Sequence, residues 1–211
     1  MTPRGAEKVV MIGGGGHAMS CLDAADPRHL DFVGYVSRQP DDRLPLKYLG
    51  DDDALEELRR SDVTSAFVAL GDNSLRRTLC GRVMELGFEL ATLVADTARV
   101  SPHASVFPGA AVLHGTFVGP RTEVGTGAVV NTAASVDHDC VIEEFAHIAP
   151  GTHLAGGVRI GAGAFAGVGA SVIPDVHVGP WAVVGAGAVV ITHVPPRETV
   201  VGAPARSRRR S

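Results

Sequence analysis

The sequence predicts two architectures in one chain of 211 residues: a small α/β domain, and after it an all-β solenoid of the parallel β-helix type. Over residues 8–94, apolar segments of strand character alternate with segments of helical character, as in a small parallel sheet with helices on both faces. Over residues 100–194, aliphatic residues return at every sixth position, which fits neither an amphipathic helix nor a simple alternating strand. We predict domains at residues 1–96 and 97–205, followed by a basic tail at residues 206–211.

The six-residue period begins at Val100 and ends at Val190, and every position of the series except Ala166 holds Val, Ile or Leu. A second series begins at Ala104 and ends at Val194, and its positions hold only Ala, Thr, Cys or Val. Hexapeptide repetition is the signature of a parallel β-helix, in which each hexapeptide forms one short strand and one corner. We expect the aliphatic residue to fill the interior and the smaller residue to fit where the coil narrows.

Three hexapeptides complete one triangular coil, so residues one coil apart should stack on one another, as Val118, Val136 and Leu154 would. With ~4.8 Å between neighbouring strands, about five coils give a prism roughly 25 Å tall. Because the repeat contains no loop insertion, we expect any site in this domain to lie on the outer surface of the prism.

In the N-terminal domain, glycine, proline and polar residues separate the predicted elements. We expect strands at residues 8–12, 31–36, 63–70 and 88–94, a loop at residues 37–50, and helices at residues 17–25, 51–60 and 74–86. Gly87 follows the last helix and is expected to cap it. This order of elements predicts a Rossmann-like parallel sheet.

Two turns of this domain follow strands directly. Four glycines and His17 come after the first strand, and Gly71-Asp72-Asn73 comes after the third, with Arg76 in the first turn of the next helix. Ligands of parallel α/β sheets bind beyond the carboxyl ends of the strands, and N–H groups at a helix start can bind phosphate. The glycine turn taken alone is also compatible with a tight strand-to-helix connection that binds nothing.

Composition narrows the classes of function. The net charge of −4 gives no indication of a nucleic-acid partner, and no apolar run is long enough to span a membrane. The N-terminus has no signal-peptide pattern, and Cys21, Cys80 and Cys140 are odd in number and far apart, so we predict reduced thiols and a cytoplasmic protein. Three metal ligands at a sensible spacing are not evident, so we predict no metal site.

Six short motifs occur in order along the chain: Gly-Gly-Gly-Gly-His at residues 13–17, Gly71-Asp72-Asn73-x-x-Arg76, Val136-Asp137-His138-Asp139-Cys140-x-Ile142, His147-Ile148-x-Pro150-Gly151, Leu154-Ala155-Gly156 and Val201-Gly202-Ala203-Pro204-Ala205. Together they resemble the family of bacterial sugar acyltransferases that contains the nucleotide-linked 4-amino-sugar N-acetyltransferases and the sialic acid O-acetyltransferases. The resemblance implies a left-handed β-helix, which the spacing alone would not reveal. It also implies a homotrimer, acetyl-CoA in the groove between neighbouring β-helices, and a sugar nucleotide on the N-terminal domain.

The resemblance also implies roles for residues of the solenoid. His138 matches the catalytic base, Asp139 the acid that orients it, and Asn131 a nearby polar residue of the site. His147 matches a histidine that contacts the acetyl group of the thioester, and Gly156 the glycine whose N–H faces the developing oxyanion. The chemistry agrees, because an amine must lose a proton to form an amide, and histidine titrates near neutral pH. An adjacent carboxylate can fix the imidazole tautomer, and an N–H can stabilise charge that grows in the transition state.

Further contacts are predicted for both substrates. We expect the rest of CoA to follow the later coils, toward Gly167, Gly185 and Arg206, where small residues leave backbone groups accessible. For the nucleotide part of the acceptor we predict contacts with the residues of the two turns: Gly14, Gly15, Gly16, His17, Asn73 and Arg76. The second strand ends in Val36-Ser37-Arg38, where the nucleotide-sugar branch of the family usually has an acidic pair, and Asp41-Asp42 comes only later.

Three functions remain open at this point. The first is acetyl-CoA-dependent N-acetylation of a nucleotide-linked amino sugar by direct attack on the thioester, with His138 as the general base. The second is O-acetylation of a sugar hydroxyl such as that of a sialic acid, which the departure at Ser37-Arg38 keeps open. The third is a trimeric scaffold without catalysis, which the complete set of His138, Asp139 and Gly156 disfavours.

Overall fold

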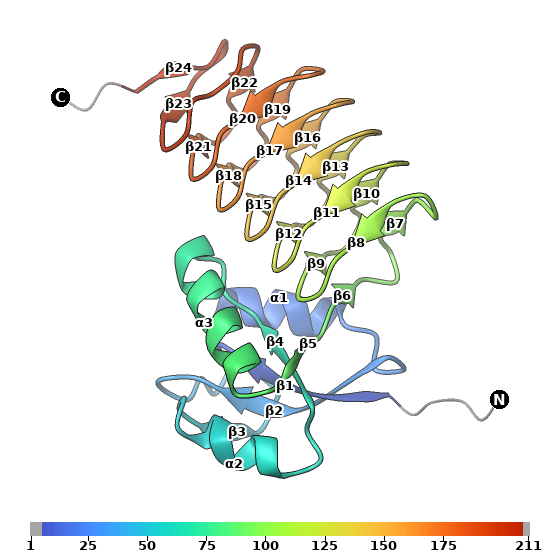
Figure 1. Cartoon of the computed structure of the whole chain (residues 1–211), viewed down its shortest axis with the longest axis vertical. Coiled ribbons are helices and arrows are strands. Elements are labelled where there is room, and N and C mark those ends of the chain that lie inside the picture. The colour runs from blue at the N-terminus through green and yellow to red at the C-terminus, as the bar shows by residue number, and fades with distance from the viewer. Residues whose placement is uncertain (1–5, 209–211) are drawn as a thin grey trace.

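The computed structural model describes residues 6–208, with the N-terminal domain beneath one face of the solenoid (Figure 1). Five parallel strands form the sheet of the N-terminal domain in the order β3-β2-β1-β4-β5. Their bounds are β1 (Glu7–Ile12), β2 (Leu30–Val36), β3 (Tyr48–Gly50), β4 (Ser65–Val68) and β5 (Glu89–Leu90). The predicted small parallel sheet is confirmed, and β3 is an additional edge strand in the segment predicted as loop.

Helices cover both faces of this sheet: α1 (Gly16–Ala24) on one, and α2 (Ala54–Arg60) and α3 (Asn73–Glu85) on the other. Successive side chains of β1 point to opposite faces of the sheet, so both faces are apolar and both are covered by helices. Val9 and Met11 pack in the core with α1, whereas Val10 and Ile12 pack in the core with α2 and α3. Both cores continue into residues of the solenoid, so the two domains share buried surface.

The solenoid is a left-handed β-helix whose strands form three parallel stacks, apart from the final antiparallel strand. One face, called here the β7 face, contains β7 (Arg99–Val100), β10 (Phe117–Val118), β13 (Ser135–Val136), β16 (His153–Leu154), β19 (Ser171–Val172) and β22 (Val189–Val190). The β8 face contains β8 (Ser105–Val106), β11 (Glu123–Val124), β14 (Val141–Ile142), β17 (Arg159–Ile160) and β20 (His177–Val178). The β9 face contains β6 (Leu93–Val94), β9 (Ala111–Val112), β12 (Val129–Val130), β15 (His147–Ile148), β18 (Phe165–Ala166), β21 (Val183–Val184), β23 (Thr199–Val201) and β24 (Arg206–Ser207).

The stacking predicted from the period is confirmed. Val118 pairs with Val136, and Val136 pairs with Leu154 on the next coil. The aliphatic residues of the first series fill the interior, and Ala166 is buried at the one position where that series has a small residue. Burying each large aliphatic side chain contributes roughly 1.5–3 kcal/mol, so the column of such residues holds the coils together.

The corners of the prism use a left-handed backbone conformation three residues after the interior aliphatic position. Glycine holds eight of these positions, and seven other residues also have positive φ there: Arg121, Ala133, Asp139, Phe145, Asp175, Trp181 and Arg197. A side chain in this conformation is unfavourable unless its surroundings stabilise it. The non-glycine corners are therefore places to look for a specific role.

The connection between the domains differs from the prediction of a single strand at residues 88–94. The chain changes partners at Ala91: its N–H donates to Ala66 of the domain sheet, whereas the N–H of Leu93 donates to Ala110 of the solenoid. The predicted strand is therefore split into β5 and β6, and the solenoid sheet begins before residue 97. At the other end, β24 pairs antiparallel with β23, so the tail begins as an edge strand; residues 209–211 lie outside the described part.

No helix within residues 6–208 has the length and apolar character needed to cross a membrane. All three cysteines are buried and unpaired, and Cys140 occupies the core position predicted from its place in the repeat.

Candidate active site

His138 lies at the corner that joins the β7 face to the β8 face, a region called here the His138 corner. The imidazole is 54% exposed, and its Nδ1 lies 2.7 Å from Oδ2 of Asp139. Since a carboxylate only accepts hydrogen bonds, Nδ1 carries the proton, and Nε2 presents a lone pair. The backbone N–H of His138 donates to Oδ1 of Asp137 at 2.8 Å, which fixes the turn. The imidazole can therefore accept a proton at Nε2.

Asp139 has a φ of 59° and occupies the left-handed position of this corner. Arg121 occupies the same position one coil earlier, and its guanidinium binds both oxygens of the Asp139 carboxylate, with Nε 2.5 Å from Oδ1 and Nη2 2.7 Å from Oδ2. The hydrogen bonds from Arg121, and then the one from His138, lower the pKa of Asp139 to about 2. Asp139 is therefore ionised at any pH at which the protein would function. The sequence interpretation missed Arg121, although the coil period applied to Asp139 points to it.

Gly156 stacks one coil above His138, as the spacing predicted. A Cβ at Gly156 would lie 2.5 Å from Cε1 and 2.7 Å from Nε2 of His138, so only glycine leaves room for the imidazole. At the next position, a Cβ at Gly157 would lie against the carboxylate of Asp175. Among residues 6–208 the N–H of Gly156 has no hydrogen-bond acceptor. A free N–H donor and a basic imidazole nitrogen therefore lie on adjacent coils.

His147 lies on β15 of the β9 face, against the N-terminal domain, and is buried. Its Nδ1 donates to the carbonyl of Gly71 at 3.2 Å, so Nε2 accepts from the side-chain amide of Asn131 at 3.2 Å. Burial lowers the pKa of His147 to about 4, and the imidazole is neutral near pH 7. Its ring lies 5.9 Å from that of His17 and 5.3 Å from that of Phe165, measured between centroids. These residues form the domain junction.

His17 lies in the first turn of α1, where Nε2 is 3.6 Å from Sγ of Cys21. Burial lowers its pKa to about 4 as well. The glycines before it divide into two kinds. Gly13 has a φ of 115° and no room for a side chain against Ala69, whereas Gly15 and Gly16 are exposed, with open space beside them. The turn therefore presents backbone at the start of α1 to solvent.

A cavity of about 410 Å³ opens at this turn, at the carboxyl ends of β1 and β2. Its walls include Gly14, Gly15, Ser37, Arg38 and Asp41, together with apolar residues of α3 and the preceding turn: Leu70, Leu75 and Leu79. Asp41 binds Arg43 at 2.6 Å, which lowers the pKa of this carboxyl to about 2. Of the two acidic residues of this loop, Asp41 lines the cavity and Asp42 is not among its lining residues; Arg38 lines it as well.

Arg76 is placed differently from its predicted contact with the nucleotide. The side chain is 1% exposed, and its N–H groups donate to the carbonyls of Leu70, Gly127 and Phe145 at 2.7–2.8 Å and to Oδ1 of Asn73 at 2.8 Å. Burial lowers its pKa to about 10, so the guanidinium remains charged at neutral pH. The predicted contact with phosphate is not supported, because the donors are directed to main-chain oxygens of the junction.

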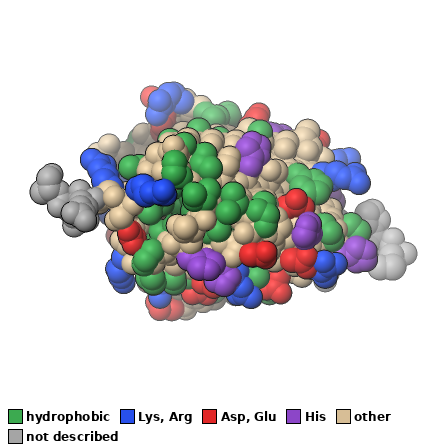
Figure 2. Space-filling model, turned by 90° about the horizontal axis from the view of Figure 1, so that it is seen from above, with side chains coloured by type: hydrophobic (Ala, Val, Ile, Leu, Met, Phe, Trp, Pro, Cys, Tyr) green, Lys and Arg blue, Asp and Glu red, His purple; other side chains and the backbone are tan. Residues whose placement is uncertain are grey.

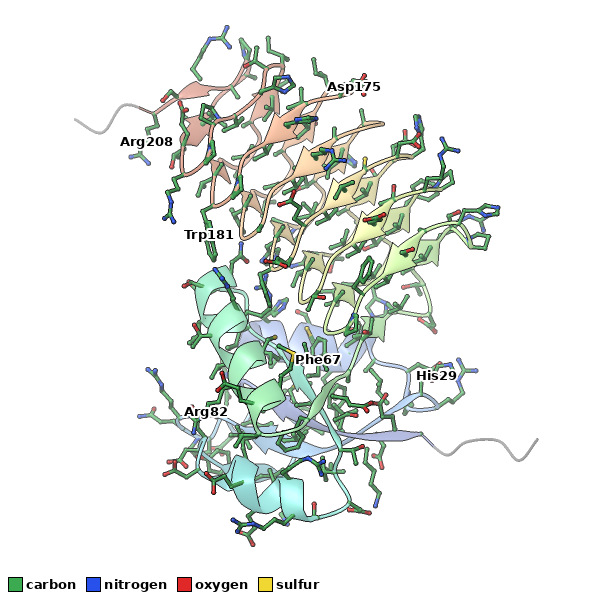
Figure 3. All side chains as sticks on the ribbon, viewed as in Figure 1. His29, Phe67, Arg82, Asp175, Trp181 and Arg208 are labelled. Atoms are coloured by element: carbon green, nitrogen blue, oxygen red, sulfur yellow. The ribbon has the colours of Figure 1, made fainter. Side chains whose placement is uncertain are left out.

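Asn73 also binds the solenoid. Its side-chain amide donates to the carbonyls of Gly163 and Ala164 at 3.0 and 3.1 Å. Gly127, Phe145 and Gly163 are the left-handed corner residues of three successive coils, so Arg76 and Asn73 bind a ladder of equivalent carbonyls. The motif Gly71-Asp72-Asn73-x-x-Arg76 therefore fixes α3 to the β-helix, and its Gly71 carbonyl accepts the hydrogen bond from His147. Trp181 is the corner residue of the next coil in this column, and it lies near the upper end of α3 (Figure 3).

The glycines predicted to contact CoA have a packing role. The N–H of Gly167 donates to Val184, and that of Gly185 donates to Val200, so neither is a free donor. A Cβ at either glycine would lie 2.7 Å from the next coil. Arg206 is exposed on β24 and donates to the carbonyl of Ala205. Open space exists instead beside Gly151, Gly169 and Gly187 at the corner that joins the β9 face to the β7 face.

The predicted residues thus form two groups on opposite sides of the prism. The His138 corner joins the β7 and β8 faces, and the third face, which carries His147, lies opposite it. Asp175, two coils further along the His138 corner, lies on the side away from the N-terminal domain (Figure 3). Exposed apolar residues of the later coils include Val168, Val183 and Val201. Seen from above, the molecule shows hydrophobic side chains interspersed with histidines and charged side chains (Figure 2).

Several known proteins are similar to this chain. A family model described as the PglD N-terminal domain matches residues 8–83. A histidine-to-alanine mutant of GDP-perosamine N-acetyltransferase from Caulobacter crescentus, in complex with CoA and GDP-perosamine, is 37% identical with a TM-score of 0.92, covering 96% of this chain and 97% of its own. The chain belongs to the hexapeptide-repeat family of bacterial sugar acyltransferases. This confirms the family inferred from the order of motifs.

Two further solved structures are also similar to this chain. PerB from the same organism, in complex with CoA and GDP-perosamine, is 39% identical with a TM-score of 0.91, covering 95% of this chain and 97% of its own. The acetyltransferase domain of PglB from Neisseria gonorrhoeae is 35% identical with a TM-score of 0.89, covering 96% of this chain and 100% of its own. No match was found among curated proteins. Among residues 6–208, no group of three or more His, Cys, Asp or Glu is placed to hold a metal ion.

Proposed function

We propose that the protein transfers the acetyl group of acetyl-CoA to the amino group of a nucleotide-linked amino sugar. The observation that carries this proposal is the His138 corner. There, an exposed imidazole has its Nδ1 fixed by Asp139 and lies one coil from the free N–H of Gly156. The similar enzymes in complex with CoA and GDP-perosamine support this choice of donor and acceptor.

In this mechanism the sugar amine attacks the thioester carbonyl, and Nε2 of His138 takes the proton that the nitrogen loses. Asp139 stabilises the imidazolium that forms and keeps the ring in one tautomer. The Gly156 N–H donates to the oxyanion of the tetrahedral intermediate, where charge develops only during the reaction. The C–S bond then breaks, and the proton passes to the departing thiolate of CoA, which regenerates the neutral base.

The nucleotide of the acceptor is assigned to the cavity beside the glycine turn. Exposed backbone at Gly15 and Gly16, at the start of α1, suits a pyrophosphate. Arg38 supplies a cation and Asp41 a hydrogen-bond acceptor in the same cavity. We assign His17 and Asn131 to the sugar and the ring of His147 to the acetyl group, because neutral imidazoles do not repel an ammonium and both nitrogens of His147 are already bonded to Gly71 and Asn131. Arg76 and Asn73 take the supporting role described above.

We further propose a homotrimer, as the family resemblance implies. His138 and His147 lie on opposite sides of one β-helix, so a site that uses both requires the His138 corner of one copy to face the domain junction of the next. A groove formed in this way would place CoA between two β-helices, along the open corner at Gly151, Gly169 and Gly187. The three unpaired cysteines support a reducing compartment, and we place the reaction in the cytoplasm.

The experiment is a thiol-release assay with acetyl-CoA and a panel of acceptors. GDP-, UDP- and dTDP-linked 4-amino sugars are compared with the free amino sugars and with a sialic acid, and products are identified by mass spectrometry. We expect N-acetylation of at least one nucleotide-linked amino sugar, with much lower kcat/KM for the free sugars. Acetylation of the sialic acid hydroxyl alone would establish the O-acetyltransferase function instead. Activity on no acceptor would contradict the enzymatic proposal.

A further inference from the structure

Arg121 has a feature that its place in the repeat does not require. Asp175 and Trp181 each lie above a glycine one coil earlier, and a Cβ at Gly157 or Gly163 would collide with them. Arg121 and Asp139 are also corner residues one coil apart, yet both carry side chains. The two side chains form an ion pair with two hydrogen bonds instead of leaving one position empty.

The position of Arg121 is not one that arginine prefers. Its φ is 57°, in the left-handed region that favours glycine, asparagine and aspartate. The ion pair adds little to the stability of the fold, because its side chains are 69% and 39% exposed and exposed ion pairs contribute little. Stability therefore does not explain why an arginine occupies this position. An explanation must therefore come from what the guanidinium does to the carboxylate.

The guanidinium determines where the carboxylate points. Asp139 is exposed enough to change rotamer, and its Oδ2 must remain near Nδ1 of His138 for the imidazole to keep Nε2 unprotonated. The two donors of Arg121 bind one carboxylate oxygen each, a planar geometry that lysine cannot supply. Oδ2 is thus shared between Arg121 and His138, and the chain of contacts runs from Arg121 through Asp139 to the base.

We propose that Arg121 is a positioning residue of the transfer reaction, which holds Asp139 in the orientation that fixes the tautomer and direction of His138. This inference rests on the proposed role of His138 as the general base. Arg121 acts from the preceding coil and touches neither the thioester nor the amine in this account. The charged groups around the imidazole are then Asp137 and Asp139 on its own turn, Arg121 one coil before, and Asp175 two coils after Asp139.

The test replaces Arg121 by Asn, which tolerates positive φ, and by Lys, which keeps the charge without the fork. Arg197→Asn is the matched control, since Arg197 is another arginine at a left-handed corner, with φ 61°. We expect Arg121→Asn to lower kcat roughly 10- to 100-fold, with KM for both substrates within about twofold of wild type. The Lys variant should recover only part of kcat, and the control should match wild type.

Two further readouts separate positioning from a structural role. Combining Arg121→Asn with Asp139→Asn should cost no more than Asp139→Asn alone, because both act through the same contact. Equal melting temperatures would show that the fold is intact. Unchanged kcat, an additive double variant, or a large rise in acceptor KM alone would overturn the proposal.

A spectroscopic measurement keeps this test separate from the proposed function. The ¹⁵N shifts of the His138 ring, assigned by comparison with His138→Gln, report the tautomer without any substrate. We expect one tautomer, protonated at Nδ1, in wild type and in Arg197→Asn, and a mixture of tautomers in Arg121→Asn. A single unchanged tautomer in Arg121→Asn contradicts the positioning role, whether or not an acceptor has been found.

Discussion

The His138 corner and the domain junction are built in different ways. At the corner, the residues that matter are neighbours in sequence or one coil apart, and their side chains are partly exposed: His138 with Asp139, and Asp139 with Arg121. At the junction, His147 binds Gly71 and Arg76 binds Gly127 and Phe145, across 50 to 80 positions of the chain, and the groups are buried. The corner therefore depends on contacts between partly exposed residues at short, fixed spacing, whereas the junction depends on buried contacts between residues far apart in the sequence.

The two regions therefore have different roles: the corner holds the groups suited to the reaction, and the junction holds the two domains together. The corner has a basic nitrogen, an ionised carboxylate and a free N–H, which acyl transfer requires. The junction has neutral imidazoles and a buried guanidinium that saturates main-chain oxygens, which fixes one domain against the other. Changes at the corner should therefore affect turnover without affecting folding, and changes at the junction should affect folding first.

The largest effect is expected at the base. Replacing His138 by Ala should lower kcat by ~10²–10⁴, the usual contribution of a positioned general base. The melting temperature should change little, because the imidazole is more than half exposed. Steady-state kinetics with the best acceptor and differential scanning fluorimetry measure both quantities. Near-normal turnover by the purified variant would remove His138 from the mechanism.

The corresponding change at the junction is Arg76→Ala. It removes a buried cation and leaves the carbonyls of Leu70, Gly127 and Phe145 without their donor. We expect a loss of about 3–5 kcal/mol in the free energy of unfolding, because several buried carbonyls lose their donor and each costs about 1–3 kcal/mol. Urea unfolding measures it, with the adjacent exposed Arg77→Ala as control. Equal unfolding midpoints for the two variants would show that Arg76 does not fix the domains.

Gly156→Ala tests the space at the corner. The added Cβ would lie 2.5 Å from Cε1 of His138, so the imidazole must move away from the N–H of residue 156. We expect kcat to fall roughly 10²-fold, the order seen when a reacting group is misplaced by about 1 Å. Gly81→Ala in α3, where a Cβ meets nothing within 4 Å, is the control and should keep full activity. If Gly156→Ala is as active as this control, the close packing is irrelevant to turnover.

The junction should also respond to pH. The pKa values of His17 and His147 are lowered to about 4 in the folded protein, against about 6.5 in the unfolded chain. Between these values the unfolded chain binds more protons, so stability is complete above pH 6.5 and falls as the pH falls toward 4. We expect a loss of about 2 kcal/mol for each histidine between pH 7 and pH 4.5.

Urea unfolding at pH 7, 5.5 and 4.5 measures this dependence. The carboxyls whose pKa values are lowered in the folded protein are Asp26, Asp41, Asp62 and Asp139, and they titrate below this pH range. The change in stability within the range is therefore assigned to the histidines. His147→Asn should unfold with a weaker dependence on pH over the same range. An identical slope in wild type and variant would show that His147 is not the group responsible.

The same difference explains what the sequence could predict. The period predicted the three faces, because the same pairing recurs on every coil, and the motif around His138 predicted the pair of His138 and Asp139, because these residues are neighbours in the sequence. The sequence did not show that Arg76 is buried, since an arginine after a strand also suits a phosphate site. The partner change at Ala91 was hidden for a similar reason: apolar residues 88–94 fit a continuous strand, and only the tertiary pairing divides them.

We expect one site to combine the His138 corner of one copy with the domain junction of another. Mixing two inactive variants tests it directly: His138→Ala, defective at the corner, and His147→Gln, which keeps a donor for Gly71 but loses the imidazole. Differently tagged chains are co-expressed, mixed trimers are purified by both tags, and activity is compared with each variant alone. Each mixed trimer has one of its three interfaces with both parts intact, so we predict roughly a third of wild-type activity. Mixed oligomers no more active than either parent, or a mass by light scattering that corresponds to one subunit in an active preparation, would contradict it.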